Sequence, residues 1–353
     1  MVEISANDGE AITNELIRGE IKGLKTDENS TGLGGAVIGL FQSDETEFTA
    51  ENALATATSA EDGSFSFAGV PYGNWVLKEL ESPEGFILSD EVLPVTVEED
   101  GQVVEISLAN ERVYGDLRLT KVDKDYPNNK LTGAEFEVYR DTNGNKELDE
   151  GDELLGKLEE TSTGIYEMSH ILYGGVFVKE TKAPEGFLLD ENAYYVEISE
   201  NGKIYEVENE AGIGFTNMAQ TGSLRIEKTS SDGKVEGFSF RVTGANGYEQ
   251  IFTTDANGEI FIEGLRVGDY TVSEVSDGAS ANYVLPADKT VTIFADKTTV
   301  AEMHNELRDT PKTGDDSKPW LWAALMGVSA MGAAALGVAA YVGKRKKGKN
   351  TVK

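Results

Sequence analysis

Short runs of alternating apolar and polar residues recur along most of the chain. The clearest runs are residues 64–70, 75–80, 103–110, 116–121, 194–199 and 238–242. A period of two residues predicts half-buried β-strands, and turn signals such as Glu-Asp-Gly, Asn-Gly and Pro-Glu-Gly separate the runs. Outside one apolar C-terminal segment, no stretch has a sustained helical period. The pattern predicts an all-β protein made of short-stranded sandwiches, followed by a C-terminal transmembrane helix.

The strand pattern occurs three times along the chain. Each copy opens on a glycine with a lysine six residues later (GEIKGLKTD, GDLRLTKVD, GSLRIEKTS) and closes on an asparagine. Asn14 precedes Gly19 by five residues, the interval that separates the later closing asparagines from the next opening glycine. Residues 1–17 are polar and acidic, without an export signal. They therefore resemble the tail of an upstream repeat, and we expect the true N-terminus to be missing.

These boundaries divide the chain into five parts. The predicted parts are the upstream tail at 1–17, three β-sandwich domains at 18–112, 113–219 and 220–308, and a terminal signal at 309–353.

Three polar residues of each repeat extend an apolar stripe. In the second repeat, Lys121 continues the face of Leu117 and Leu119, because side chains two residues apart share one face of a strand. Burying an isolated charge is costly, so three such residues in every repeat need a physical reason. The residues are the lysines Lys25, Lys121 and Lys228, the glutamates Glu79, Glu180 and Glu274, and the asparagines Asn110, Asn217 and Asn305.

A covalent bond between lysine and asparagine would supply that reason. Burial lowers the pKa of a lysine and raises that of a glutamate. A neutral amine held against the side-chain carbon of asparagine is a competent nucleophile, and a protonated glutamate can polarise the amide and move protons. The product would be a Lys–Asn isopeptide bond, formed with loss of ammonia. The alternative is a loose lysine–glutamate pair at the strand ends that reaches solvent.

The repeats resemble the collagen-adhesin B-type (Cna-B, or SpaA-type prealbumin-like) domains of Gram-positive adhesins and pilins. The shared marks are the Lys-x-Asp opening, LTGAEF from Leu131 and the ET-x-APEGF segment, all present in the second repeat. The first repeat has GAVI in place of GAEF, and the third has GFSF and lacks APEGF. In that family the matching residues form autocatalytic isopeptide bonds, which implies one triad per repeat. In the second repeat Asn209 is an alternative to Asn217, which keeps the spacing and is favoured.

The C-terminal segment has the layout of a membrane span with a basic end. Residues 320–342 carry no charge and are long enough to cross a bilayer as a helix. The basic residues that follow would stay cytoplasmic, which places the body of the protein outside the cell.

The residues before this span resemble the LPXTG sorting signal of Gram-positive surface proteins, with threonine in place of leucine. They are Thr310, Pro311, Lys312, Thr313 and Gly314. The resemblance implies that sortase cuts between Thr313 and Gly314 and joins the protein to a peptidoglycan cross-bridge. The chain would then be in the membrane only before cleavage. The alternative is a plain single-span membrane anchor.

The amino-acid composition argues against several classes of function. The net charge of −32 repels phosphate backbones, so no nucleic-acid partner is expected. The absence of cysteine excludes a cysteine nucleophile and disulfides, and two histidines are too few for a His/Cys zinc site. Nothing in the chain indicates an enzyme that acts on an external substrate. No cofactor is expected, calcium at residues 141–152 excepted.

Residues 141–152, DTNGNKELDEGD, resemble an EF-hand calcium loop. The candidate ligands are Asp141, Asn143, Asn145, Asp149 and Asp152. The loop departs from the pattern by having Lys146 where the sharp-turn glycine belongs and aspartate in place of the final glutamate. The alternative is a solvated acidic hairpin.

These features together predict a secreted, cell-wall-anchored stalk or adhesin segment. It would hold a missing N-terminal region, with any host or matrix ligand, away from the wall. Two alternatives stay open. A pilin subunit polymerised by sortase is one, although Asn128 stands where a pilin motif after Tyr-Pro has lysine. The other is the stalk of a secreted enzyme whose catalytic head is missing.

Overall fold

The computed structural model describes residues 15–308 of the 353-residue chain. These residues form 24 β-strands and one short 3-10 turn, Ala245–Gly247. The prediction of an all-β protein is therefore confirmed. Within this range, no helix is both long and apolar enough to cross a membrane. The expected span at 320–342 and the sorting signal lie outside the described residues.

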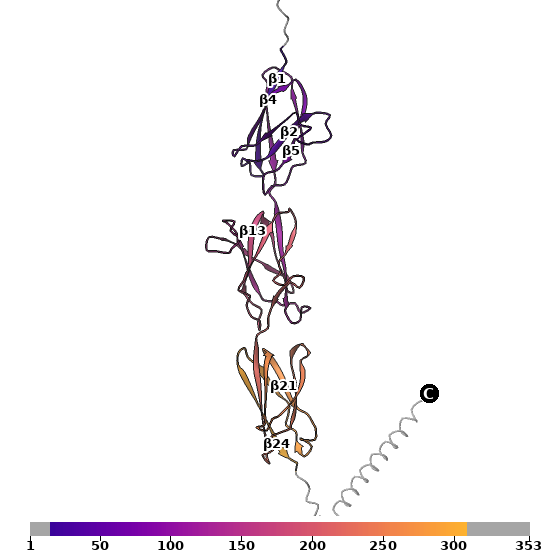
Figure 1. The fold of residues 1–353 in the computed structure, drawn as a ribbon, viewed down its shortest axis with the longest axis vertical. Coiled ribbons are helices and arrows are strands. Elements are labelled where there is room, and N and C mark those ends of the chain that lie inside the picture. Colours follow the sequence, from indigo (N-terminus) through magenta and orange to yellow (C-terminus); the bar gives the residue numbers. More distant parts are fainter. Residues whose placement is uncertain (1–14, 309–353) are drawn as a thin grey trace, which may run out of the picture. The chain divides into compact units, whose positions relative to one another are not determined.

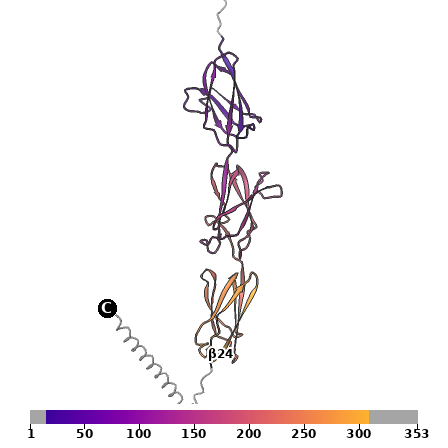
Figure 2. The ribbon, with the colours of Figure 1, turned by 180° about the vertical axis from the view of Figure 1, so that it is seen from behind.

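The strands gather into three sandwiches, one for each repeat of the sequence (Figure 1). Seen from both sides, the strands of each sandwich form two facing layers (Figures 1 and 2). Among the described strands, each sheet contains strands of one repeat only. Contact density divides the chain into two compact units, the first containing the first two repeats and the second most of the third. Each sandwich is therefore described by itself.

The first sandwich has a three-stranded sheet in the order β4-β1-β7 and a four-stranded sheet in the order β3-β2-β5-β6. Strands β1 and β7 run parallel, and the other pairs are antiparallel. The bounds are β1 Arg18–Asp27, β2 Val37–Gln42, β3 Ala55–Thr58, β4 Ser64–Pro71, β5 Gly73–Glu81, β6 Val92–Val97 and β7 Val103–Asn110.

The second sandwich repeats this plan with its last strand in two pieces. One sheet has the order β11-β12-β8-β15, with β16 also paired to β8, and the other has the order β10-β9-β13-β14. The bounds are β8 Tyr114–Asp123, β9 Glu135–Arg140, β10 Glu153–Lys157, β11 Glu159–Ser162, β12 Ile165–Leu172, β13 Gly174–Lys182, β14 Ala193–Ile198, β15 Ile204–Glu206 and β16 Phe215–Asn217.

The third sandwich has two four-stranded sheets, β20-β17-β24-β22 and β19-β18-β21-β23. The bounds are β17 Thr221–Ser230, β18 Ser239–Thr243, β19 Glu249–Thr253, β20 Glu259–Arg266, β21 Gly268–Glu274, β22 Tyr283–Val284, β23 Lys289–Ile293 and β24 Thr298–Leu307.

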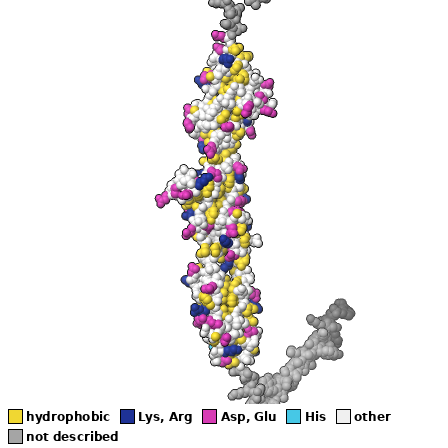
Figure 3. Space-filling model, viewed as in Figure 1, with side chains coloured by type: hydrophobic (Ala, Val, Ile, Leu, Met, Phe, Trp, Pro, Cys, Tyr) yellow, Lys and Arg dark blue, Asp and Glu magenta, His cyan; other side chains and the backbone are white. Residues whose placement is uncertain are grey.

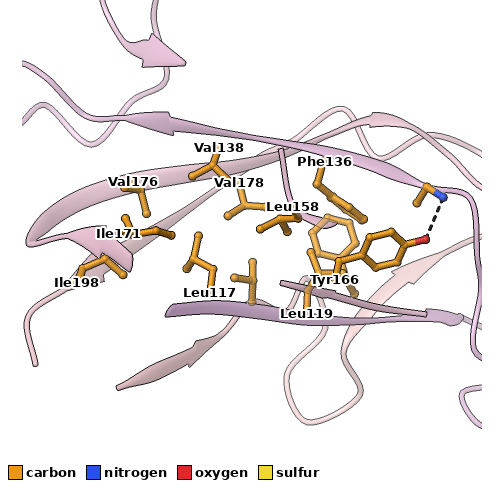
Figure 4. Close-up of a cluster of buried hydrophobic side chains, with 13 residues drawn as sticks. Leu117, Leu119, Phe136, Val138, Leu158, Tyr166, Ile171, Val176, Val178 and Ile198 are labelled. Carbon is orange, nitrogen blue, oxygen red and sulfur yellow. Dashed lines mark hydrogen bonds between the residues drawn. The ribbon is translucent and has the colours of Figure 1, made fainter. Parts of the chain in front are cut away.

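The core of each sandwich lies between its sheets, and the second shows how it is built. Alternate residues of β8 are buried, since successive side chains of a strand point to opposite faces. Leu117 and Leu119 on β8 thus face Val138 on the opposite sheet (Figure 4). Tyr166 closes one end of this cluster, and its hydroxyl accepts the backbone N–H of Ala134 at 3.1 Å. The tyrosine is thereby buried without leaving its hydroxyl unpaired.

Carboxylates are spread over the visible face of all three sandwiches, with fewer basic groups between them (Figure 3). This agrees with 63 acidic against 31 basic residues in the chain. Such a surface keeps an exposed protein soluble and repels polyanions.

Candidate functional site

The lysine and the asparagine of a triad lie on neighbouring parallel strands in the first two repeats. Asn110 on β7 pairs with the residue two places after Lys25 on β1. In the same way Asn217 on β16 pairs with the residue two places after Lys121 on β8. Because residues two apart share a face, both side chains point into the core. Both lysines have no exposed surface.

The glutamate comes from the opposite sheet. Glu79 lies on β5, where it pairs with Ile38 of β2, and Glu180 lies on β13, where it pairs with Phe136 of β9. The two glutamates are 2% and 0% exposed. Each carboxylate therefore crosses the core and meets the lysine and asparagine of the facing sheet.

In the first repeat the three side chains form a closed set of contacts. The Lys25 Nζ donates to Asn110 Oδ1 at 2.5 Å and lies 3.2 Å from Glu79 Oε1. The Asn110 Nδ2 in turn donates to Glu79 Oε1 at 2.8 Å. The amine thus lies against the side-chain amide, and the carboxyl group contacts both the amine and the amide nitrogen.

The second repeat has the same geometry. The Lys121 Nζ donates to Asn217 Oδ1 and lies 3.2 Å from Glu180 Oε1. Both carboxylate oxygens of Glu180 accept from Asn217 Nδ2 at 2.9 Å. The ring of Phe215 lies 4.6 Å from the Lys121 Nζ and covers it from water.

Burial favours the neutral form of these lysines. Desolvation lowers the pKa of Lys121 to about 8, although the nearby Glu180 carboxylate acts in the opposite direction. The pKa of Lys25 is also lowered, again mainly by desolvation and against the effect of Glu79. A proton can pass directly from lysine to glutamate at the separation of 3.2 Å seen in both repeats. This transfer would give the neutral amine that nucleophilic attack requires.

The third triad is buried but arranged differently. Asn305 Nδ2 donates to Glu274 Oε1 at 2.6 Å, as in the other repeats. The Lys228 Nζ instead donates to the backbone oxygen of Thr229 at 2.5 Å. Asn305 Oδ1 and Glu274 Oε2 are buried without a hydrogen-bond partner. Desolvation raises the pKa of Glu274 and lowers that of Lys228.

Comparison with known proteins gives the family of these repeats. The SpaA prealbumin-like fold domain matches the chain three times, at residues 19–112, 115–211 and 222–307. The chain belongs to the SpaA family of prealbumin-like domains. No curated protein matches it at a significant level.

Solved structures give further likenesses to the SpaA repeats. The TIE protein of Bacillus anthracis is 26% identical with a TM-score of 0.63, over 82% of this chain and 51% of that one. The chain thus spans about half the length of that protein. BcpA, the major pilin subunit of Bacillus cereus, is 15% identical with a TM-score of 0.39, over 82% and 99% of the two chains. The major pilin SpaD of Corynebacterium diphtheriae is 13% identical with a TM-score of 0.25, over 83% and 98%.

The Pro-Glu-Gly-Phe segment of the first two SpaA repeats forms a turn that places a backbone N–H group against the triad glutamate. Its glycine has a positive φ, 81° at Gly85, and the N–H of Phe86 donates to Pro83 O at 3.1 Å. This turn brings the N–H of Ser89 to Glu79 Oε2 at 2.8 Å. The second repeat has the same contact at 2.8 Å, from the N–H of Asp190 to Glu180 Oε2.

The third SpaA repeat lacks this segment, and its glutamate keeps one unpartnered oxygen. From the sequence, Pro-Glu-Gly-Phe was interpreted as a turn signal and a family mark, and the two backbone donors to the glutamates were not predicted. The signal was present as a constant interval of ten residues, from Glu79 to Ser89 and from Glu180 to Asp190.

The aspartate of the Lys-x-Asp opening was also missed as a structural residue. Asp27 is buried directly opposite Asn110 in the β1–β7 pair. Its Oδ1 accepts the N–H groups of Asn29 and Thr31, and its Oδ2 accepts from Arg112 at 2.6 Å. Asp27 therefore fixes the turn that follows the lysine strand.

The two asparagines considered in the second repeat have different positions. Asn217 lies in the triad, beside Lys121 and Glu180. Asn209 is half-buried and binds Thr216 and Asp190 instead.

The acidic loop at residues 141–152 connects β9 to β10. The carboxylates of its three candidate aspartate ligands accept N–H groups of the loop itself: Asp141 from Gly144 and Lys146, Asp149 from Asn143, Asn145 and Gly151, and Asp152 from Thr142 and Asp149. Lys146 has a φ of 61°, the left-handed conformation that favours glycine at a sharp turn. Within residues 15–308, no group of three or more His, Cys, Asp or Glu side chains is arranged to hold a metal. Calcium binding here stays a prediction.

Proposed function

We propose that the chain is a structural stalk segment of a Gram-positive surface protein, whose SpaA domains are stapled by Lys–Asn isopeptide bonds. The observation that carries this proposal is the contact of a buried lysine amine with both an asparagine amide and a glutamate carboxyl in the first two repeats. Each triad would form its bond once and within its own chain, so this chemistry would not act on an external substrate.

The proposed reaction needs no co-reactant. The proton of the Lys121 ammonium passes to Glu180, and the neutral Nζ attacks Cγ of Asn217. Glu180 then returns its proton to Nδ2, the Cγ–Nδ2 bond breaks, and ammonia leaves. The second Nζ proton lost on bond formation passes to Glu180 and stays there, so the product holds a neutral amide and a neutral carboxyl group. The buried charges disappear, which removes the cost of holding them out of water.

We further propose that sortase attaches the stalk to the wall. Support comes from the TPKTG sequence at residues 310–314, followed by the uncharged residues 320–342 and a basic end. The partners would be sortase and a peptidoglycan cross-bridge. Any host or matrix ligand would be bound by a region other than these three repeats.

Peptide mapping tests the stapled stalk. The protein is denatured, digested and analysed by tandem mass spectrometry. We expect one branched peptide that joins the segments around Lys121 and Asn217, with a mass lower than their sum by one ammonia. The equivalent peptide should join Lys25 to Asn110. Recovery of all four segments as separate linear peptides would overturn the proposal.

The rate of bond formation in the second repeat should fall as the pH rises above about 8. Below its pKa of about 8, the Lys121 amine carries the proton that the proposed reaction passes to Glu180. Above that value the pair loses the proton that Glu180 must donate, so the rate should fall about tenfold per pH unit. The measurement is the mass of chains refolded from denaturant at pH 7 to 10 and quenched at intervals. A rate that rises through pH 8 would show that the free amine reacts without the acid.

The third repeat should form its bond last. Lys228 must first release the backbone oxygen of Thr229. Breaking a hydrogen bond to a charged group costs about 1.5–3 kcal/mol, which slows the reaction roughly 10- to 100-fold. Quenched refolding samples, digested and mapped, give the rate for each repeat separately. Equal rates for the Lys25 and Lys228 bonds would contradict this prediction.

A further inference from the structure

The strand that carries the reacting asparagine is interrupted in the second repeat. In the first repeat, β7 is continuous from Val103 to Asn110, and in the third, β24 runs from Thr298 to Leu307. In the second repeat β15 ends at Glu206 and β16 begins at Phe215. Asn217 is therefore held on a strand of three residues. Among the described strands, only β8 pairs with β16.

One side chain from the interruption binds the open edge of β16. Asn209 Oδ1 accepts the N–H of Thr216 at 2.6 Å, and Asn209 Nδ2 donates to Thr216 O at 2.8 Å. A single amide thus binds both backbone groups of the residue before Asn217, as a neighbouring strand would. Thr216 itself is buried, so unpaired backbone groups there would be costly.

The same amide is connected to the glutamate of the triad. Asn209 Nδ2 donates to Asp190 Oδ2 at 2.8 Å, and the hydroxyl of Tyr194 donates to that oxygen at 2.6 Å. The backbone N–H of Asp190 donates to Glu180 Oε2 at 2.8 Å. Asn209 therefore lies between two fixed points, the backbone next to Asn217 and the residue that holds Glu180.

We infer that Asn209 is a positioning residue for the isopeptide bond of the second repeat. It replaces the continuous strand of the other repeats and keeps the amide of Asn217 against the Lys121 amine. The inference rests on the proposed bond and adds a residue to the machinery that forms it. Since a misplacement of about 1 Å can slow a positioned reaction about 100-fold, loss of this clamp should be visible in the rate.

The test is the rate of bond formation in the full-length chain with Asn209→Ala. Chains are kept unfolded in denaturant, their unreacted mass is verified, and refolding is started by dilution. Quenched samples are digested, and the branched peptides of the first and second repeats are followed separately. We expect the Lys121–Asn217 bond to form roughly 10- to 100-fold more slowly and still to reach completion. The Lys25–Asn110 bond of the same molecules should keep its rate and so serves as internal control.

Two further variants keep the result decisive. Asn128→Ala changes an exposed asparagine of the same repeat and should react like the wild type. Asn209→Asp keeps the acceptor for the N–H of Thr216 but replaces both donors by an oxygen that faces Asp190 Oδ2 and Thr216 O, so it should react at least as slowly as Asn209→Ala. If circular dichroism shows that Asn209→Ala does not fold, the rate of Asn209→Asp tests the positioning role instead.

The remaining outcomes would overturn either the positioning role of Asn209 or the proposed bond itself. An unchanged rate in Asn209→Ala, or in Asn209→Asp where the alanine variant is unfolded, would overturn the positioning role. So would a bond to Asn209 itself, shown by an Asn217→Ala variant that still loses ammonia in this repeat. If the wild-type chain forms no bond in the second repeat, the proposed function fails before the role of Asn209 arises.

Discussion

Glu180→Gln should leave the second repeat without its cross-link and markedly less stable. Glutamine keeps the shape of the side chain but cannot take up and return the proton, and loss of a general acid or base slows a reaction roughly 10²- to 10⁴-fold. The missing bond would have closed a loop between residues 96 positions apart. By the chain-entropy model a cross-link over about 100 residues contributes about 4.7 kcal/mol to the free energy of unfolding.

Thermal unfolding measures this loss directly. For a domain of about 100 residues, a decrease of this size lowers the melting temperature by about 20 °C or more. The matched control is Glu159→Gln, which changes an exposed glutamate of β11 in the same repeat. That control should melt like the wild type. A Glu180→Gln protein with the ammonia deficit and the melting temperature of the wild type would refute the role of Glu180.

Thr313→Ala should abolish attachment to the wall. The proposed sortase step joins the carbonyl of Thr313 to a wall amine, so a residue that the enzyme does not recognise there should stop the transfer. In a Gram-positive host, the wild-type protein is expected in the fraction released by muramidase. The variant is expected almost entirely in the membrane fraction and the medium.

Lys312→Ala is the control for this prediction, because the middle position of the LPXTG pattern accepts any residue. It should be anchored like the wild type. Equal wall fractions for Thr313→Ala and the wild type, measured by immunoblot, would contradict sortase anchoring at this position.

The strands and the members of the triads could be predicted because both depend on a period of two. A lysine that continues the buried face of Leu117 and Leu119 must point into the core, whatever the length of the intervening loops. The same argument placed Glu180 and Asn217 on core faces. Which of two nearby asparagines meets the lysine depended on spacing, and the geometry places Asn217 there.

Other features could not be predicted, because they depend on loops and on side-chain conformation. The residues between β15 and β16 do not alternate between apolar and polar, so the sequence does not predict their structure. The binding of Asn209 to the backbone of Thr216 is visible only in three dimensions. The contact of the Lys228 Nζ with the backbone oxygen of Thr229 depends on the side-chain conformation of Lys228, which the alternating pattern of the strand does not determine. The absence of Pro-Glu-Gly-Phe from the third repeat was visible in the sequence, but its consequence for Glu274 was not.

The intact mass of the folded protein tests the central claim most directly. The recombinant chain is measured with Glu79→Gln, Glu180→Gln and Glu274→Gln variants alongside, after long incubation so that the third repeat has reacted. We predict a deficit of three ammonia molecules in the wild type and of two in each variant. A wild-type mass equal to that of the unmodified sequence would contradict the stapled stalk.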